Sequence, residues 1–173
     1  MVLTARGAYL HELQIGAAES YVRHVRTPEA LTDAFRQQGL KVTPQRQLLF
    51  RLLHGNHTHP SADSLHAVAS ARMPGISLRT VYQTLTDLAS MGELQVLTFG
   101  AGPQRFDPNV TEHHHAECDQ CGRLRDVYVQ QMPELPVHGL DGFHTHSTSI
   151  VFRGRCEDCA IAEPFSTSTT SLH

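Results

Sequence analysis

Four cysteines, arranged as two Cys-x-x-Cys pairs, constrain the fold of this chain more than any other feature. The pairs are Cys118 with Cys121 and Cys156 with Cys159, and they account for every cysteine in the 173 residues. Two such turns can hold four thiolates in a tetrahedron around Zn(II), which leaves no coordination position for an activated water. The pattern therefore predicts a structural zinc site that ties together two segments with 34 residues between them.

Two independent redox motifs of the thioredoxin type are the alternative. Such a motif needs a thiolate at a helix N-terminus in a βαβ setting. Here LRDVYV follows the first pair and SIVFRG precedes the second, which predicts strands over 124–129 and 149–154 instead. Four cysteines are also a sparse disulfide framework, and no segment has the apolar length of a membrane helix or a signal peptide. We expect a cytoplasmic protein with no membrane partner.

Charge divides unevenly along the chain. Residues 1–106 hold 10 Lys and Arg against 7 Asp and Glu, whereas residues 107–173 hold 4 against 10. A mildly basic half followed by an acidic half rich in His and Cys is typical of a nucleic-acid reader joined to a metal-binding module. Ordinary surface charge is the simpler explanation of the same numbers. The hydrophobic content of 40% allows one large core or two small ones.

The first half predicts three consecutive helices. They are expected over 28–38, 44–54 and 62–73, with Thr43 and Ser61 as N-caps of the second and third. Apolar residues recur along them at helical spacing. The positions expected to face the core are Leu31, Ala34, Phe35, Leu48, Leu49, Leu52, Leu53, Leu65, Val68 and Ala69.

A fourth helix and a hairpin complete a winged helix-turn-helix. The helix is expected over 78–90, after a Ser77 cap, and LQVLTF and QRFD flank the turn GAGP as two strands. In this architecture the last helix before the wing enters the major groove. An amphipathic surface helix without a ligand is the alternative. The side chains expected to meet base edges or phosphates are Arg79, Thr80, Tyr82, Gln83 and Thr84.

Histidines and carboxylates surround the first cysteine pair. In EHHHAECDQC, an extended backbone puts alternate histidines on one face. Three imidazoles with two carboxylates suit Fe(II), Mn(II), Ni(II) or Zn(II). A solvated histidine turn and a polar interhelical loop are the alternatives. The candidate ligands of this exchangeable site are His59, Asp107, His113, His115 and Asp126.

The chain resembles the ferric uptake regulator (Fur) superfamily over about residues 28–160. Six motifs carry the resemblance in order: TPQR at 43–46, HP at 59–60, TVYQTL at 80–85, RFD at 105–107, EHHHAECDQCG at 112–122 and GRCEDC at 154–159. The resemblance implies an α+β homodimer in which a winged helix-turn-helix DNA-binding domain precedes a small α/β dimerisation domain with structural zinc. Such a dimer binds double-stranded operator DNA with an inverted repeat when a regulatory metal is present.

The resemblance also implies domain boundaries. We expect an N-terminal extension over 1–26, the winged-helix domain over 27–106, the metal-binding dimerisation domain over 107–162 and a flexible tail over 163–173. The segment MPELPVHGLDG, 132–142, contains two prolines where members often have a longer helix. The dimerisation domain is therefore expected to be shortened here.

Within the superfamily the chain is most similar to the peroxide-sensing branch. Iron-uptake members tend to carry glutamates at the positions of Asp107 and Asp126, and zinc-uptake members often have cysteine at the first. The likeness implies regulatory Fe(II) or Mn(II) at the five candidate ligands and oxidation of His59 or His113 by peroxide. A regulator of iron, nickel or zinc homeostasis is the alternative within the family.

Other readings differ in class. A third metal site of some members draws on a histidine where this chain has Thr148, with His144 and His146 nearby. A mononuclear metal hydrolase needs a general base and a substrate pocket that the sequence does not offer, so we expect no enzyme. A metal-storage module has no use for a helix such as 78–90.

Overall fold

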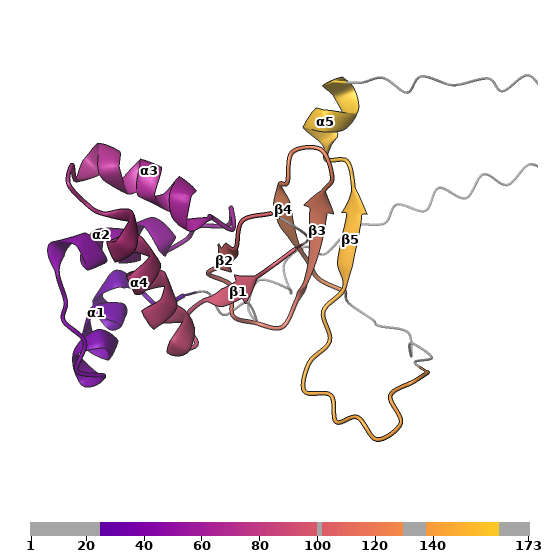
Figure 1. The fold of residues 1–173 in the computed structure, drawn as a ribbon, viewed down its shortest axis with the longest axis horizontal. Coiled ribbons are helices and arrows are strands. Elements are labelled where there is room, and N and C mark those ends of the chain that lie inside the picture. The colour runs from indigo at the N-terminus through magenta and orange to yellow at the C-terminus, as the bar shows by residue number, and fades with distance from the viewer. Residues whose placement is uncertain (1–24, 100–101, 130–137, 163–173) are drawn as a thin grey trace, which may run out of the picture.

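The computed structural model describes residues 25–99, 102–129 and 138–162. Helices form one unit and a three-stranded sheet forms the other, with a small hairpin between them (Figure 1). This mixed architecture agrees with the expected winged helix followed by an α/β domain. Parts of four expected features lie outside the described residues: the N-terminal extension up to residue 24, residues 100–101 of the expected GAGP turn, most of the proline segment and the expected tail over 163–173.

Four helices make the first unit: α1 (Pro28–Gln37), α2 (Pro44–Leu53), α3 (Ala62–Arg72) and α4 (Leu78–Ser90). Each begins directly after a hydroxyl side chain that accepts a backbone N–H of the first turn, which satisfies one of the unpaired donors there. The caps predicted at 43, 61 and 77 are confirmed. None of the described helices has the length and hydropathy to span a bilayer. The four capping residues are Thr27, Thr43, Ser61 and Ser77.

The core of this unit is formed by side chains from all four helices. Phe35 and Phe50 pack edge to face there, with ring centroids 4.8 Å apart. The prediction that Val68 faces the core is wrong, because α3 buries only a narrow stripe of Ala62, Leu65 and Ala69, and Val68 is 47% exposed beside it. Leu52 is only partly buried against the cluster.

Thr84 belongs to the buried face of α4. Its side chain is fully buried, and its hydroxyl donates to the carbonyl oxygen of Thr80 over 2.7 Å. The expectation that Thr84 points outward is therefore wrong. The reason is that Thr84 lies one helical turn from both Val81 and Leu88, so it shares their apolar face.

The hairpin and the sheet have different topologies. Strands β1 (Gln95–Leu97) and β2 (Arg105–Asp107) pair antiparallel, as predicted. The larger sheet has the order β4-β3-β5. It consists of β3 (His114–Cys118), β4 (Leu124–Val127) and β5 (Val151–Gly154), followed by the short helix α5 (Glu157–Ala162).

Strand direction puts the two cysteine pairs at one end of this sheet. β3 runs antiparallel to β4 but parallel to β5, and Cys118 is the register partner of Gly154. The two cysteine pairs therefore lie at the same end of the sheet, one at the end of β3 and the other after β5. Among the residues that the structure describes, β5 pairs only with β3, so its other side forms an edge of this sheet, of the kind that can pair with another strand.

Candidate metal centres and DNA-facing helix

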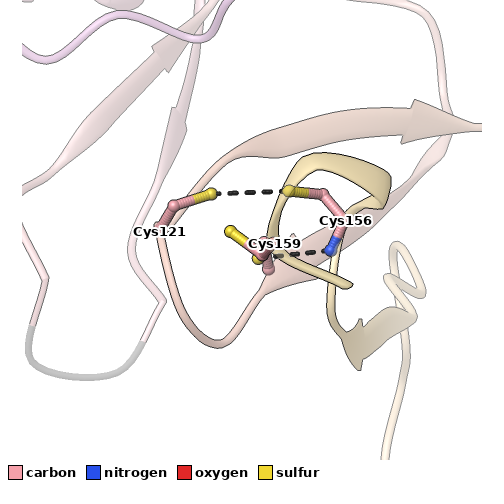
Figure 2. A group of neighbouring side chains, drawn as sticks. Cys121, Cys156 and Cys159 are labelled. Atoms are coloured by element: carbon pink, nitrogen blue, oxygen red, sulfur yellow. Dashed lines mark hydrogen bonds between the residues drawn. The ribbon is translucent and has the colours of Figure 1, made fainter. Parts of the chain in front are cut away.

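The four cysteine sulfurs converge beyond the ends of β3 and β5. All four are free thiols, and their sulfur atoms lie within 4.8 Å of one another. Figure 2 shows Cys121 and Cys156 pointing toward each other, with their sulfurs 3.7 Å apart. The backbone N–H of Cys156 donates to the sulfur of Cys118 over 3.3 Å. The structure thus brings together the whole predicted four-cysteine set.

Backbone donors at this cluster favour a thiolate. The N–H groups of Cys156 and Cys121 lower the pKa of the Cys118 thiol to about 6. Hydrogen bonds with the sulfurs of Cys156 and Cys121 raise the pKa of Cys159 to about 12. The Cys118 thiol therefore loses its proton readily, whereas the Cys159 thiol requires a cation to do so. Four sulfur donors at this separation fit a tetrahedral Zn(II) ion.

A second cluster joins the helical unit to the sheet. His59 comes from the loop between α2 and α3, and Asp107 is the last residue of β2. His113 precedes β3, His115 lies within it, and Asp126 lies in β4. One ligand atom from each lies within 4.8 Å of all the others. All five predicted ligands are thus brought together.

The imidazoles of this cluster face the two carboxylates. His113 Nε2 lies 2.9 Å from Asp107 Oδ2 and 3.0 Å from His115 Nε2. His59 Nε2 lies 2.6 Å from Asp126 Oδ1. His114 accepts the backbone N–H of Ile150 and does not join the cluster, as the alternation along the strand predicts.

Several buried polar atoms here have no hydrogen bond. They include both ring nitrogens of His59, Nδ1 of His115 and Oδ1 of Asp126. The contact between His59 and Asp126 is short but lacks hydrogen-bond alignment, so it does not satisfy either atom. A buried polar atom without a partner costs about 1–3 kcal/mol. A divalent cation between the five groups would satisfy His59 Nε2 and Asp126 Oδ1, so the residues fit such an ion.

Charge in the cluster is balanced by a proton. Burial alone would lower the pKa of His113, but the neighbouring carboxylates of Asp107 and Asp126 raise it to about 10. Burial raises the pKa of the two carboxyls, yet the neighbouring histidines hold the pKa of each below its usual range. Without a metal ion, the protonated His113 therefore serves as the counter-charge of the aspartates.

The loop that carries His59 is held in a strained shape. His59 has a φ of +49°, the only positive value at a non-glycine position in the described part of the chain. This left-handed backbone conformation costs about 1–2 kcal/mol. The wing strand fixes this loop, because Phe106 N–H donates to the Pro60 carbonyl and Arg105 Nη1 donates to the His59 carbonyl.

A polar groove lies between the starts of α2 and α4. Arg79, Tyr82 and Gln83 are exposed on α4, whereas Thr80 is half-buried and bonded to Ser77. The sequence analysis did not predict the four groove residues at and before the start of α2, although three of them, Thr43, Gln45 and Arg46, belong to the TPQR motif. The groove is lined by Lys41, Thr43, Gln45, Arg46, Arg79, Thr80 and Gln83.

His144 and His146 remain apart from both clusters. Both side chains are exposed in the segment before β5. Within residues 25–99, 102–129 and 138–162, the metal-competent groups are the four-cysteine set and the five-residue His/Asp set. A third site at these histidines therefore has no support among the described residues.

Comparison with known proteins identifies the family. The sequence model of the ferric uptake regulator family matches residues 37–153. The chain is 37% identical over 129 residues to the peroxide-responsive repressor PerR of Staphylococcus aureus, which covers 73% of this chain and 86% of that protein.

Solved structures have the same fold at lower identity. The ferric uptake regulator of Helicobacter pylori superposes with a TM-score of 0.63 at 19% identity, over 79% of this chain and 95% of that one. The ferric uptake regulator of Francisella tularensis superposes with a TM-score of 0.57 at 22% identity, over 70% and 95%. The family match spans well over half of the chain, and the chain therefore belongs to the ferric uptake regulator family of metal-responsive repressors.

Proposed function

We propose that this protein is a dimeric, metal-dependent repressor of transcription that responds to peroxide. One observation carries the proposal: a five-donor cluster with two aspartates spans the helical unit and the sheet unit. The 37% identity to a peroxide-responsive repressor supports the signal. In this proposal 27–106 reads DNA, and 107–162 binds metal and forms the dimer.

Metal binding controls the geometry of the dimer in this proposal. His59 belongs to the helical unit, whereas His113, His115 and Asp126 belong to the sheet unit, so one ion can be held by all of them only when the units are close. That closure sets the two copies of α4 about one duplex turn apart, which matches an inverted-repeat operator. A preference of a few kcal/mol for the closed form changes occupancy many-fold.

The remaining parts have supporting roles. Cys118, Cys121, Cys156 and Cys159 hold Zn(II) as a structural ion, and the free edge of β5 suits pairing with a second copy. Operator contacts come from exposed side chains on the starts of α2 and α4. The exposed ones are Lys41, just before α2, and Arg79, Tyr82 and Gln83 on α4, and the half-buried Gln45 and Thr80 lie beside them.

The choice of regulatory ion decides the response to peroxide. Fe(II) held by these residues would supply the redox chemistry that activates peroxide, whereas Mn(II) would hold the two units together without it. The imidazoles of His59 and His113 lie in the cluster, within reach of an oxidant generated there. Transfer of one peroxide oxygen to either ring, with the other oxygen leaving as water, would weaken a metal ligand, so the units would separate and the operator would be released.

Mass spectrometry tests the proposal. The protein is loaded with Fe(II), treated with peroxide and digested, and a gain of one oxygen is expected on a peptide containing His59 or His113, together with loss of operator binding. The Mn(II) form should keep both its mass and its operator. An intact operator complex with unmodified histidines after Fe(II) and peroxide would refute peroxide sensing.

The donor set also fits a regulator of iron, nickel or zinc homeostasis. Three imidazoles and two carboxylates accommodate each of these ions. Operator binding at physiological free concentrations of Fe(II), Mn(II), Ni(II) and Zn(II) separates the two functions. A response to Ni(II) or Zn(II) alone, with no effect of peroxide, would favour homeostasis.

A further inference from the structure

Asn109 lies between the two aspartates of the His/Asp cluster. It is 2% exposed and follows β2 in the chain. Its backbone N–H donates to Asp107 Oδ1 over 2.8 Å, and its side-chain Nδ2 donates to Asp126 Oδ2 over the same distance. One residue therefore anchors one oxygen of each carboxylate.

Other bonds fix Asn109 itself. Its Oδ1 accepts the backbone N–H of Thr111 over 3.2 Å, and its carbonyl oxygen accepts Gln95 Nε2 over 2.9 Å. Nδ2 also donates to the phenol oxygen of Tyr128 over 2.7 Å, and that phenol donates to Asp126 Oδ2 over 3.3 Å. The amide is thus held at both ends, and it cannot swing away from Asp126 without breaking these bonds.

The second oxygen of each aspartate faces the imidazoles. Asp107 Oδ2 lies 2.9 Å from His113 Nε2. Asp126 Oδ1 lies 2.6 Å from His59 Nε2 and is buried without a hydrogen bond. The oxygens of Asp126 are therefore divided into one that is occupied by the Asn109 amide and one that is directed into the cluster.

We infer that Asn109 is a positioning residue that limits Asp126 to a single metal-facing oxygen and thereby tunes the selectivity of the site. The inference rests on the proposed regulatory metal site and deepens it. A carboxylate with both oxygens free can bind an ion through both, which adds an oxygen donor and favours harder ions of higher coordination number. Groups that orient metal ligands typically change metal affinity by about 10–100-fold.

Co(II) is the probe of choice, because its visible d–d absorption reports coordination number. Full-length protein is first loaded with Zn(II) at the cysteines and then titrated with Co(II). N109S retains a hydroxyl that can accept the Thr111 N–H but cannot reach Asp126, and N109D keeps the size of the side chain but removes its donor. N56S is the matched control, since the bonds of Asn56 go to Leu52 and Thr58 and not to a ligand.

We expect both Asn109 variants to bind Co(II) on the order of 10-fold more weakly than the parent protein, with weaker d–d absorption for each bound ion. N56S should match the parent in both. Zinc content and circular dichroism identify the variants that fold, and either folded variant of Asn109 is sufficient for the comparison. A parental spectrum and affinity in that variant, or an equal change in N56S, would overturn the inference.

Failure of the inference differs from failure of the proposed function. Co(II) binding and its spectrum are measured without DNA and without peroxide. A parent protein that binds Co(II) in the cluster but shows no operator binding would contradict the proposed function and leave the role of Asn109 measurable.

Discussion

The guanidinium of Arg105 donates from Nη2 to the carbonyl oxygen of Gly122, 3.0 Å away in the first cysteine turn. Its Nη1 donates to the carbonyl oxygen of His59. One side chain on the wing therefore connects the strained loop of the His/Asp cluster with the turn that holds Cys121. The two proposed metal sites are therefore connected by the hydrogen bonds of Arg105 as well as by the continuous backbone.

Replacing Arg105 with lysine should weaken metal binding by the His/Asp cluster. A single ammonium cannot reproduce the two-pronged geometry of a guanidinium, so at least one of the two carbonyl bonds is lost. One hydrogen bond contributes about 1 kcal/mol, which corresponds to about 5-fold weaker Mn(II) binding in an electron paramagnetic resonance titration. The zinc content should stay unchanged. R125K, at an exposed position on β4, is the control, and equal losses in both variants would argue against the link.

Metal affinity of the His/Asp cluster should rise with pH. The pKa of His113 is raised to about 10 in the metal-free protein, so this ring carries a proton at neutral pH that a metal ion must displace. Mn(II) affinity measured between pH 6 and pH 8 should therefore increase by up to about 10-fold per pH unit, with proton release on binding. Binding that is independent of pH would contradict a protonated His113.

Stability of the metal-free protein should have its own pH profile. The raised pKa of His113 stabilises the fold fully below its ordinary value of 6.5, and this contribution is lost as the pH rises through about 10. The lowered pKa of Asp126 stabilises the fold above 3.8, and this contribution is lost on further acidification. Thermal unfolding in EDTA should show a maximum between these limits. A midpoint that climbs steadily to pH 10 would be the contrary result.

Chelation should separate the two metal sites. EDTA is expected to remove the ion of the His/Asp cluster and abolish operator binding while the secondary structure persists, because four thiolates retain Zn(II) far more strongly. C156S should instead lose zinc and disrupt the sheet unit, which is measured by zinc content and size-exclusion chromatography. Operator binding that survives EDTA with the cluster verified as metal-free would contradict metal control.

Two substitutions on α4 should affect different properties: R79A should weaken operator binding, and T84V should lower the stability of the fold. R79A removes an exposed cation, so operator affinity should fall and the slope of log affinity against log salt should drop by about 1. T84V replaces a buried hydroxyl bonded to Thr80 with a methyl group of similar size, so it should cost about 1 kcal/mol of stability and leave DNA binding unchanged. Fluorescence anisotropy with operator DNA at several salt concentrations measures the binding of both variants, and thermal unfolding measures the stability of T84V. A loss of binding in T84V would contradict the buried position.

Features that depend on neighbouring residues were predictable from the sequence. The caps at Thr43 and Ser61 act within one helical turn, and the alternation of His113 and His115 follows from the strand period alone. The position of Val68 was not predictable in this way, because the width of a buried helical stripe is set by the helices packed against it.

Hydrogen bonds between residues far apart in the chain were also not predictable from the sequence. Asn109 follows β2, and its side chain reaches a strand residue 17 positions further along. Arg105 bonds two backbone carbonyls, and a carbonyl carries no residue identity that a motif could display. The ligands of a metal site are therefore visible in a sequence well before the residues that orient them.

The parallel pairing of β3 with β5 has a consequence for variation among relatives. Because Cys118 and Gly154 are register partners, the two halves of the cysteine cluster meet whatever the length of the chain that connects the strands. Insertions and deletions in that connection can accumulate over evolution without displacing a single sulfur. The four cysteines and the segment that connects the strands can therefore change at different rates among relatives.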